Sequence, residues 1–272
     1  MVEHKLLNGR LTLQGWSRSV TGTGFYIPEL KLALDAGRTD NLSRASHILV
    51  THGHIDHSLQ IPWALGMRTL TSSKKTKVFF PLEHLDRLER LIHAASDLDE
   101  GSYDYQLIGA EPGQSYYLRN SWRVKVIRVD HRLYSVGYIL VEERSRLKEE
   151  YKGLQAKELA RLSEKHQLTD RIEIPTMAFL GDTTTKTFEW HPELLELPVI
   201  ITECTFLDDF HRENALQTGH THWNDLEAIV RSHPRTTFVL THFSLRYSDY
   251  YIREFFRSLP HQPKNVLLCV DH

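Results

Sequence analysis

The stretch "ILVTHGHIDHSLQIP" at residues 48–62 decides the fold, because an apolar strand ends there in a turn crowded with titratable groups. Its first three residues are apolar and uncharged, which is typical of a strand buried on both faces within a layered sheet. The next part, 52–57, reads H-G-H-I-D-H. Four such groups beside a core cost free energy unless a cation neutralises them, so the turn predicts a metal site.

The turn indicates two metal ions rather than one. His52 and His54 share a side by strand-like alternation, whereas Asp56 and His57 stand at a helix start and point elsewhere. Each ion then needs ligands from distant strand ends, which can meet at one sheet edge. The candidates that follow apolar runs are His131 (with Asp130 as its rival), Asp182 and His242. A carboxylate can bridge two ions, and Asp182 suits that role.

Composition places the chain among ordinary globular proteins. It has 272 residues, 40% hydrophobic and 25% charged, with a net charge of −2 that excludes binding to nucleic acid through bulk positive charge alone. Histidine is frequent, at 17 residues, and the two cysteines form no C-x-x-C pair. No stretch approaches 18 apolar residues, and the first residues lack a signal-peptide core, so we expect a cytoplasmic protein with no membrane segment.

Short strands and helices alternate in both halves, which predicts an α/β (α+β) fold: a four-layer αββα sandwich in a single domain, 1–272. Helices are expected after the first motif (starting near Pro62), over 81–98, 221–234 and 249–260, with a last strand over 265–272. The charged segment from Arg144 to about Gln167 predicts a solvated surface helix or helix pair. His84 and His211 are expected at the surface.

Taken together, the motifs resemble those of the metallo-β-lactamase superfamily and, within it, its ribonuclease Z branch, the endonucleases that mature the 3′ end of tRNA. The resemblance spans most of the chain, in the family order. It is carried by "THGHIDH" (51–57), "DH" (130–131), "GDT" (181–183), "ECTFLD" (203–208), "GHTH" (219–222) and "THFSLRYS" (241–248).

The resemblance implies a role for each matching residue. One Zn²⁺ takes His52, His54 and His131; the second takes Asp56, His57 and His242; Asp182 bridges them. Asp56 also orients or deprotonates the attacking water. Glu203 and His220 pass a proton to the leaving 3′ oxygen, with His222 as the rival of His220. Ser244, Arg246 and Tyr247 contact phosphate. Mn²⁺ or Fe can occupy similar ligands.

Three departures bear on the substrate. Arg38 stands where many family members have an acidic residue, and Thr202 replaces a histidine. The tRNA-gripping arm of the family is Gly/Pro-rich, whereas 144–174 lacks that signature and is expected to be a reduced arm. The function that the resemblance implies is removal of 3′ trailers from precursor tRNA, by a possible homodimer. The alternatives are a dizinc hydrolase of a small ester, thioester or cyclic phosphodiester, and a non-catalytic relative, which would have lost ligands.

Overall fold

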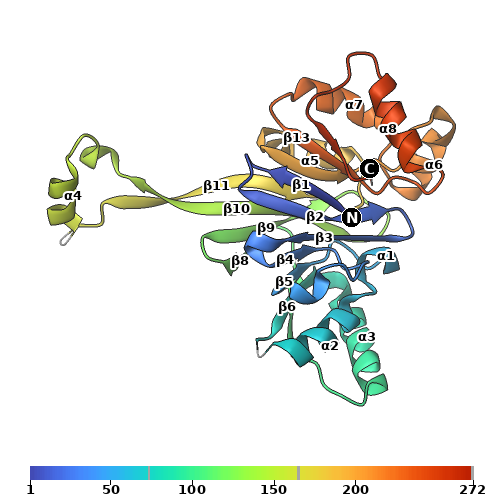
Figure 1. Cartoon of the computed structure of the whole chain (residues 1–272), viewed down its shortest axis with the longest axis horizontal. Helices are drawn as coiled ribbons and strands as arrows, with labels where there is room; N and C mark the ends of the chain where they lie inside the picture. Colours follow the sequence, from blue (N-terminus) through green and yellow to red (C-terminus); the bar gives the residue numbers. More distant parts are fainter. Residues whose placement is uncertain (73, 164–165, 271–272) are drawn as a thin grey trace.

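A computed structural model describes residues 1–72, 74–163 and 166–270 and contains two seven-stranded sheets (Figure 1). The first sheet has the order β1-β2-β3-β4-β5-β6-β7 and the second has the order β14-β13-β12-β11-β10-β9-β8. The predicted mixed α/β architecture with two sheets is therefore confirmed.

The strands of the first sheet are β1 Val2–Leu6, β2 Leu11–Arg18, β3 Gly22–Ile27, β4 Leu32–Leu34, β5 His47–Leu49, β6 Thr76–Pro81 and β7 Tyr105–Ala110. Those of the second are β8 Ser115–Arg119, β9 Trp122–Val129, β10 Ser135–Leu147, β11 Thr169–Phe179, β12 Val199–Glu203, β13 Thr237–Thr241 and β14 Val266–Leu268. The strand predicted over 265–272 is thus shorter, and residues 271–272 lie outside the described part.

The helices are α1 Ile55–Ser58, α2 Ile61–Thr71, α3 Leu85–Leu98, α4 Ala156–Ser163, α5 Lys186–Trp190, α6 Arg212–Thr218, α7 Trp223–Ser232 and α8 Asp249–Ser258. Pro62 lies in the first turn of α2, where its missing N–H costs nothing. The short helices α5 and α6 lie where no helix is expected from the sequence. No helix among the described residues has the length and apolar composition needed to span a membrane.

Three hydrophobic clusters define the layers. The largest joins the facing sides of both sheets, with Leu34 from the first and Tyr138 from the second fully buried in it. A second packs α7 and α8 on the outer face of the second sheet, and a third packs α2 and α3 on the outer face of the first (Figure 1). The facing sides of the two sheets thus share one core.

The direction of the strands brings the candidate functional residues to one end of the second sheet. β11, β12 and β13 are parallel, and β9 runs in the same direction because both β9 and β11 pair antiparallel with β10. The residues that follow these four strands therefore meet at one end. In the first sheet β5 pairs parallel with β4 and β6, and the H-x-H-x-D-H turn follows its end.

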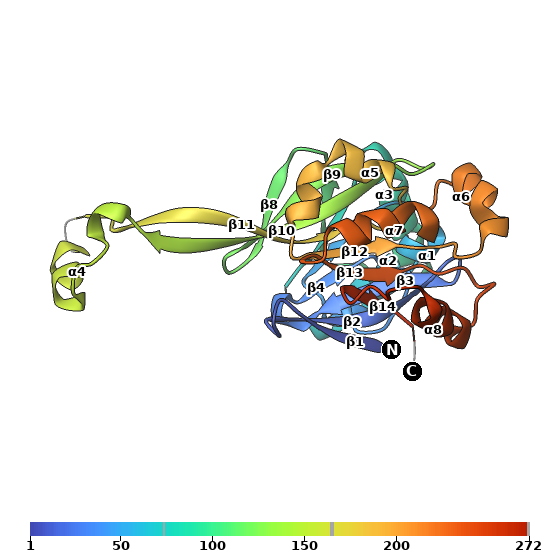
Figure 2. The ribbon, with the colours of Figure 1, turned by 90° about the horizontal axis from the view of Figure 1, so that it is seen from above.

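The helix predicted over 144–167 is wrong for most of its length. β10 continues through Arg144 to Leu147 and pairs in register with β11, from Glu142↔Ile174 to Leu147↔Thr169, so a two-stranded ribbon projects far from the body (Figure 2). Among the described residues of this segment, helix occurs at the tip, as the 3-10 turn Glu149–Tyr151 and the helix α4. Cross-strand pairing that continues from the sheet outweighs the local helix preference of the charged residues.

His84 also differs from expectation. It is only 7% exposed and lies edge-on to the ring of Tyr134, 6.3 Å between centroids. His84 ends the short 3-10 turn Leu82–His84 after β6, and its contact with Tyr134 joins residues far apart in the sequence, which no local pattern reveals.

Candidate metal centre

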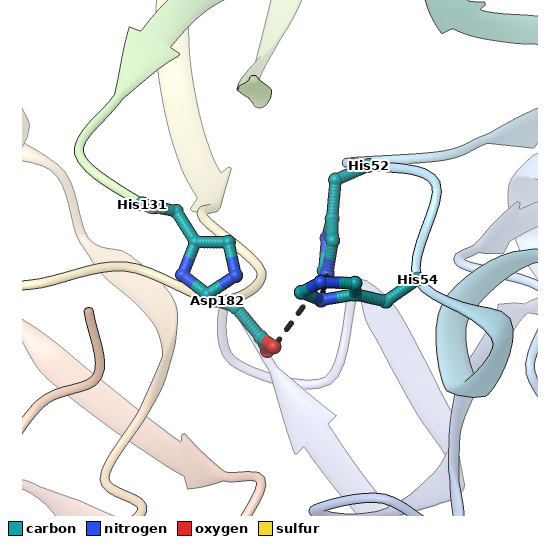
Figure 3. Close-up of side chains that lie close together, drawn as sticks. All are labelled: His52, His54, His131 and Asp182. Carbon is teal, nitrogen blue, oxygen red and sulfur yellow. Dashed lines mark hydrogen bonds and ion pairs between the residues drawn. The ribbon is translucent and has the colours of Figure 1, made fainter. Parts of the chain in front are cut away.

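The structure brings together all seven predicted ligands from five segments of the chain. His52 and His54 follow β5, and Asp56 and His57 lie in α1. The remaining three follow strands of the second sheet: His131 after β9, Asp182 after β11 and His242 after β13. Figure 3 shows His52, His54, His131 and Asp182 pointing toward one another.

The ligand atoms form adjacent groups that share one carboxylate. One group is His52, His54, His131 and Asp182; another is Asp56, His57 and His242; within each group all ligand atoms lie within 4.8 Å of one another. Asp182 lies between them, because its Oδ2 is 3.6 Å from His52 Nε2 while its Oδ1 is 3.3 Å from His57 Nε2 and 3.5 Å from His242 Nε2. This is the geometry of a bridging ligand.

Unsatisfied buried atoms show that the residues fit divalent cations. His131 Nε2 and Asp182 Oδ1 are buried without a hydrogen-bond partner, a costly state that a bound cation would relieve. Burial lowers the pKa of His52, His54 and His131, which keeps these imidazoles neutral, as metal ligands must be. The chain therefore has a divalent metal site.

A second set of contacts orients the imidazole rings. His57 Nδ1 bonds Asp35 Oδ2 at 2.7 Å, and His131 Nδ1 donates to the Gly219 carbonyl at 2.8 Å. His52 Nδ1 lies 3.0 Å from Thr51 Oγ1. With Nδ1 engaged in each ring, Nε2 is left for the metal.

Two residues at the site have a backbone conformation that residues other than glycine rarely adopt. Asp35 and His242 have φ of 56° and 59°, in the left-handed region. Such strain persists only where the surroundings enforce it, and it gathers at functional sites. Gly181, with φ of 61°, precedes Asp182, and a Cβ there would lie 2.5 Å from Thr51 Oγ1. The glycine of Gly-Asp-Thr thus lets the bridging aspartate approach the first sheet.

Glu203 and His220 form a buried pair beside the ligands. Glu203, the last residue of β12, accepts from His220 Nδ1 at 2.7 Å and from the amides of Thr183 and Thr221. Burial alone would lower the pKa of His220, but the carboxylates of Glu203, foremost, and of Asp182 outweigh it and raise this pKa to about 9. His220 stacks 5.3 Å from the ring of His242, between centroids, so it can deliver a proton close to the metal ligands.

His222, the alternative to His220 as proton donor, has a structural role. It is the N-cap of α7: its Nδ1 accepts the Asn224 amide at 3.1 Å, and its Nε2 donates to the Asp208 carbonyl at 3.0 Å. Both ring nitrogens are used within the protein, and the ring is buried.

The three residues predicted to contact phosphate lie on the loop after β13. Arg246 is exposed and its Nη1 donates to Ser244 Oγ at 3.1 Å, so these two present polar atoms together. Tyr247 is buried, and its hydroxyl accepts the amides of Leu207 and Asp208 at 3.2 and 3.3 Å. This hydroxyl therefore ties the loop after β13 to the loop after β12.

The sequence analysis did not identify two residues that orient the candidate metal ligands. The Asp35 carboxylate is fully buried and also accepts the Thr51 amide at 2.7 Å. Thr205 Oγ1 bonds Glu203 and lies 3.1 Å from His242 Nδ1, so it links the pair to a ligand. The signal for Asp35 was present, because "LALDAG" is an apolar run followed by Asp, like the other strand ends. Thr205 has no comparable signal.

Known proteins share this fold and these motifs. The profile of the beta-lactamase superfamily domain matches residues 21–243, so the chain belongs to the beta-lactamase superfamily. The chain is 31% identical to "tRNase Z TRZ2, chloroplastic" of Arabidopsis thaliana, covering 89% of this chain and 70% of that protein. It is 29% identical to tRNase Z TRZ1 of the same plant, covering 91% and 90%. Within the superfamily, the chain belongs to the tRNase Z family, as the motifs predict.

A solved structure agrees at the level of the fold. The crystal structure of human tRNase Z, short form (ELAC1), superimposes with a TM-score of 0.61 at 19% identity, covering 96% of each chain.

Proposed function

We propose that this chain is a dizinc phosphodiesterase that removes 3′ trailers from precursor tRNA. The observation that carries the proposal is a pair of ligand groups with Asp182 between them, beside the Glu203–His220 pair. The names of the relatives, tRNase Z, support tRNA as the substrate class. All seven ligands are present, which argues against a non-catalytic relative.

Two zinc ions are proposed because imidazole and carboxylate ligands suit zinc in hydrolytic sites. One would be held by His52, His54 and His131, the other by Asp56, His57 and His242, with Asp182 bridging. When bound, the ions supply a water of lowered pKa and positive charge beside the phosphate oxygens.

The protein's own groups would place the substrate and move protons. The pKa of Asp56 is lowered to about 2, since contacts with His242 and His57 outweigh burial, so Asp56 is an anionic acceptor that can orient the attacking water. Arg246 would hold a non-bridging phosphate oxygen. As the water oxygen bonds to phosphorus, the P–O3′ bond breaks and His220 protonates the departing 3′ oxygen. The products are a 3′-hydroxyl on the tRNA and a 5′-phosphate on the trailer.

The ribbon is proposed as the substrate-binding arm. Residues 144–174 contain eight Lys and Arg against six Asp and Glu, a net +2 in a chain of net −2. The tip lies far from the body (Figure 2), where it can contact a part of a folded RNA distant from the cut.

A homodimer is proposed from an exposed apolar stripe along α1 and α2. The stripe consists of Ile55, Leu59, Trp63, Met67 and Leu70, at spacings of four, four, four and three residues, each at least 38% exposed. Within α2 the spacing places Trp63, Met67 and Leu70 on one helix face, and Ile55 in α1 and Leu59 in the link between the helices precede them along the chain. Among the residues of α2 only Arg68 is charged, so the stripe suits a self-complementary contact with a second copy.

A cytoplasmic location is also proposed. Cys204 and Cys269 are both buried and unpaired, which agrees with a reducing compartment. One relative is named as chloroplastic, so imaging of the tagged chain in its own cells tests this point.

Incubation with a precursor tRNA that carries a 3′ trailer tests the activity. We expect one cut after the discriminator base and about two zinc ions per chain by elemental analysis. The variant His220→Ala should keep its zinc and cut about 100-fold or more slowly, since general acid catalysis contributes that much. His93→Ala, an exposed histidine on α3, serves as the control. Hydrolysis of bis(p-nitrophenyl) phosphate without any cut in the tRNA would refute the assigned substrate.

A further inference from the structure

His211 lies in a short 3-10 turn, Asp209–His211, on the loop between β12 and α6. Its ring packs 5.8 Å from the ring of Phe206, at 45°, and 6.4 Å from that of Tyr247, at 61°. The side chain is partly exposed. The two flanking rings therefore fix the imidazole while one part of it faces solvent.

A row of rings connects His211 to the metal centre. Phe206 lies 6.4 Å from the ring of His220, and the Arg246 guanidinium lies 6.0 Å from the Phe206 centroid. His220 in turn lies 5.1 Å from the ring of the ligand His131. His211 thus stands on the side of the centre where the leaving oxygen would take its proton.

The imidazole of His211 has unused binding capacity. Neither ring nitrogen has a hydrogen-bond partner within 1–72, 74–163 and 166–270, whereas both nitrogens of the nearby His222 are engaged. A flat ring with free polar atoms, held between two buried rings, suits the face and edge of a nucleobase.

We propose that His211 is a specificity residue that stacks on the base of the nucleoside whose 3′ oxygen leaves. The ribose that carries the leaving 3′ oxygen also carries the base of that nucleoside. When this oxygen lies next to His220, the base can therefore reach the rings of Phe206 and His211. The inference rests on the proposed function, because only cleavage of RNA places a nucleoside on the leaving-group side.

Calorimetric titration of the zinc-loaded chain with two probes tests the inference. Adenosine 3′-monophosphate carries a phosphate and a base, and ribose 3-phosphate lacks the base. The unmodified chain should bind the first about tenfold more tightly, the size expected for one stacked base. His211→Ala should bind both probes equally, His211→Trp should keep the preference, and His93→Ala should behave as the unmodified chain.

Equal affinity for both probes in the unmodified chain, or an unchanged preference in His211→Ala, would overturn the inference. Circular dichroism and zinc content verify that each variant is folded. The calorimetric titration uses no precursor tRNA, so its result for His211 is independent of the result of the tRNA cleavage assay. Base-dependent binding without tRNA cleavage would reject only the substrate, and tRNA cleavage without base-dependent binding would reject only the role of His211.

Discussion

At the scale of single residues, the metal centre depends on side chains that are not ligands. A histidine ligand needs its second nitrogen fixed, and Asp35 and Thr205 fix those of His57 and His242. Asp35 and His57 both follow strands of the first sheet, and Thr205 and His242 both follow strands of the second, so each sheet orients its own histidine. Substitutions at Asp35 and Thr205 should therefore lower the affinity for metal while the fold is kept.

Asp35→Asn tests this dependence. The substitution keeps the size of the side chain but removes the charge that His57 faces, so zinc affinity should fall about 10- to 100-fold. Competition with a chelator at fixed pH measures it. Asp86→Asn, on the exposed face of α3, is the matched control. Unchanged affinity in Asp35→Asn would show that Thr51 and the backbone suffice to orient the ligand.

Glu203→Gln tests the electrostatic control of His220. In the metal-free protein the His220 pKa is raised to about 9, so the pair stabilises the fold fully below pH 6.5, and this contribution is lost as pH rises through 9. In Glu203→Gln the carboxylate is gone and burial dominates, so the pKa should fall below 6.5 and the imidazole should be neutral at pH 7. NMR titration of the imidazole measures both values. Titration near 9 in the variant would assign the shift to other groups.

At the scale of elements, the ribbon of β10 and β11 is the feature that departs most from its sequence pattern. A bulge leaves Thr176 of β11 unpaired, between the pairs Leu140↔Met177 and Val141↔Pro175, close to where β10 makes its last pair with β9 at Glu142. Such a bulge bends and twists the strand, which redirects it away from the body. The described residues of the ribbon are mostly exposed and contribute little to the core, which fits a role in binding rather than in stability.

Replacing residues 143–173 by an Asn-Gly turn between the paired residues Glu142 and Ile174 tests that role. This turn suits a two-residue hairpin. The shortened chain should keep its zinc and its hydrolysis of bis(p-nitrophenyl) phosphate. For precursor tRNA, kcat/KM should fall about tenfold or more, because distant contacts with the RNA are lost. Equal cleavage of tRNA by both chains would remove the ribbon from substrate binding.

At the scale of the whole molecule, the apolar stripe begins at Ile55, within the metal turn itself, and continues along α2. A second copy docked on this stripe would place two metal centres near one interface. In Trp63→Glu a charge enters the stripe at a side chain already 40% exposed, so the monomer core is untouched and the dimer should dissociate. Light scattering should report twice the chain mass before the change and the single chain mass after it.

Trp190→Glu is the matched control, because Trp190 is 41% exposed on α5, which packs against the other sheet. It should leave the mass unchanged. A single-chain mass for the unmodified protein would contradict the homodimer.

The sequence predicted the ligands because their rule is local: an apolar run that ends in His, Asp or Glu must place that group at a strand end. It predicted Glu203 and His220 only through a family resemblance, since their contact joins residues 17 apart. It could not predict the ribbon, because a charged segment such as 144–167 fits a helix locally, and only pairing with a distant strand decides otherwise.

By itself, then, the sequence determined the two-sheet fold and the family and indicated the candidate metal ligands, since each depends on residue type and short-range order. The tertiary structure decided between His220 and His222, because His220 contacts Glu203 whereas His222 contacts the Asp208 carbonyl. It also decided that His211 borders the centre and where the ribbon points. Those features depend on distances between segments that only the packing of the two sheets brings within contact.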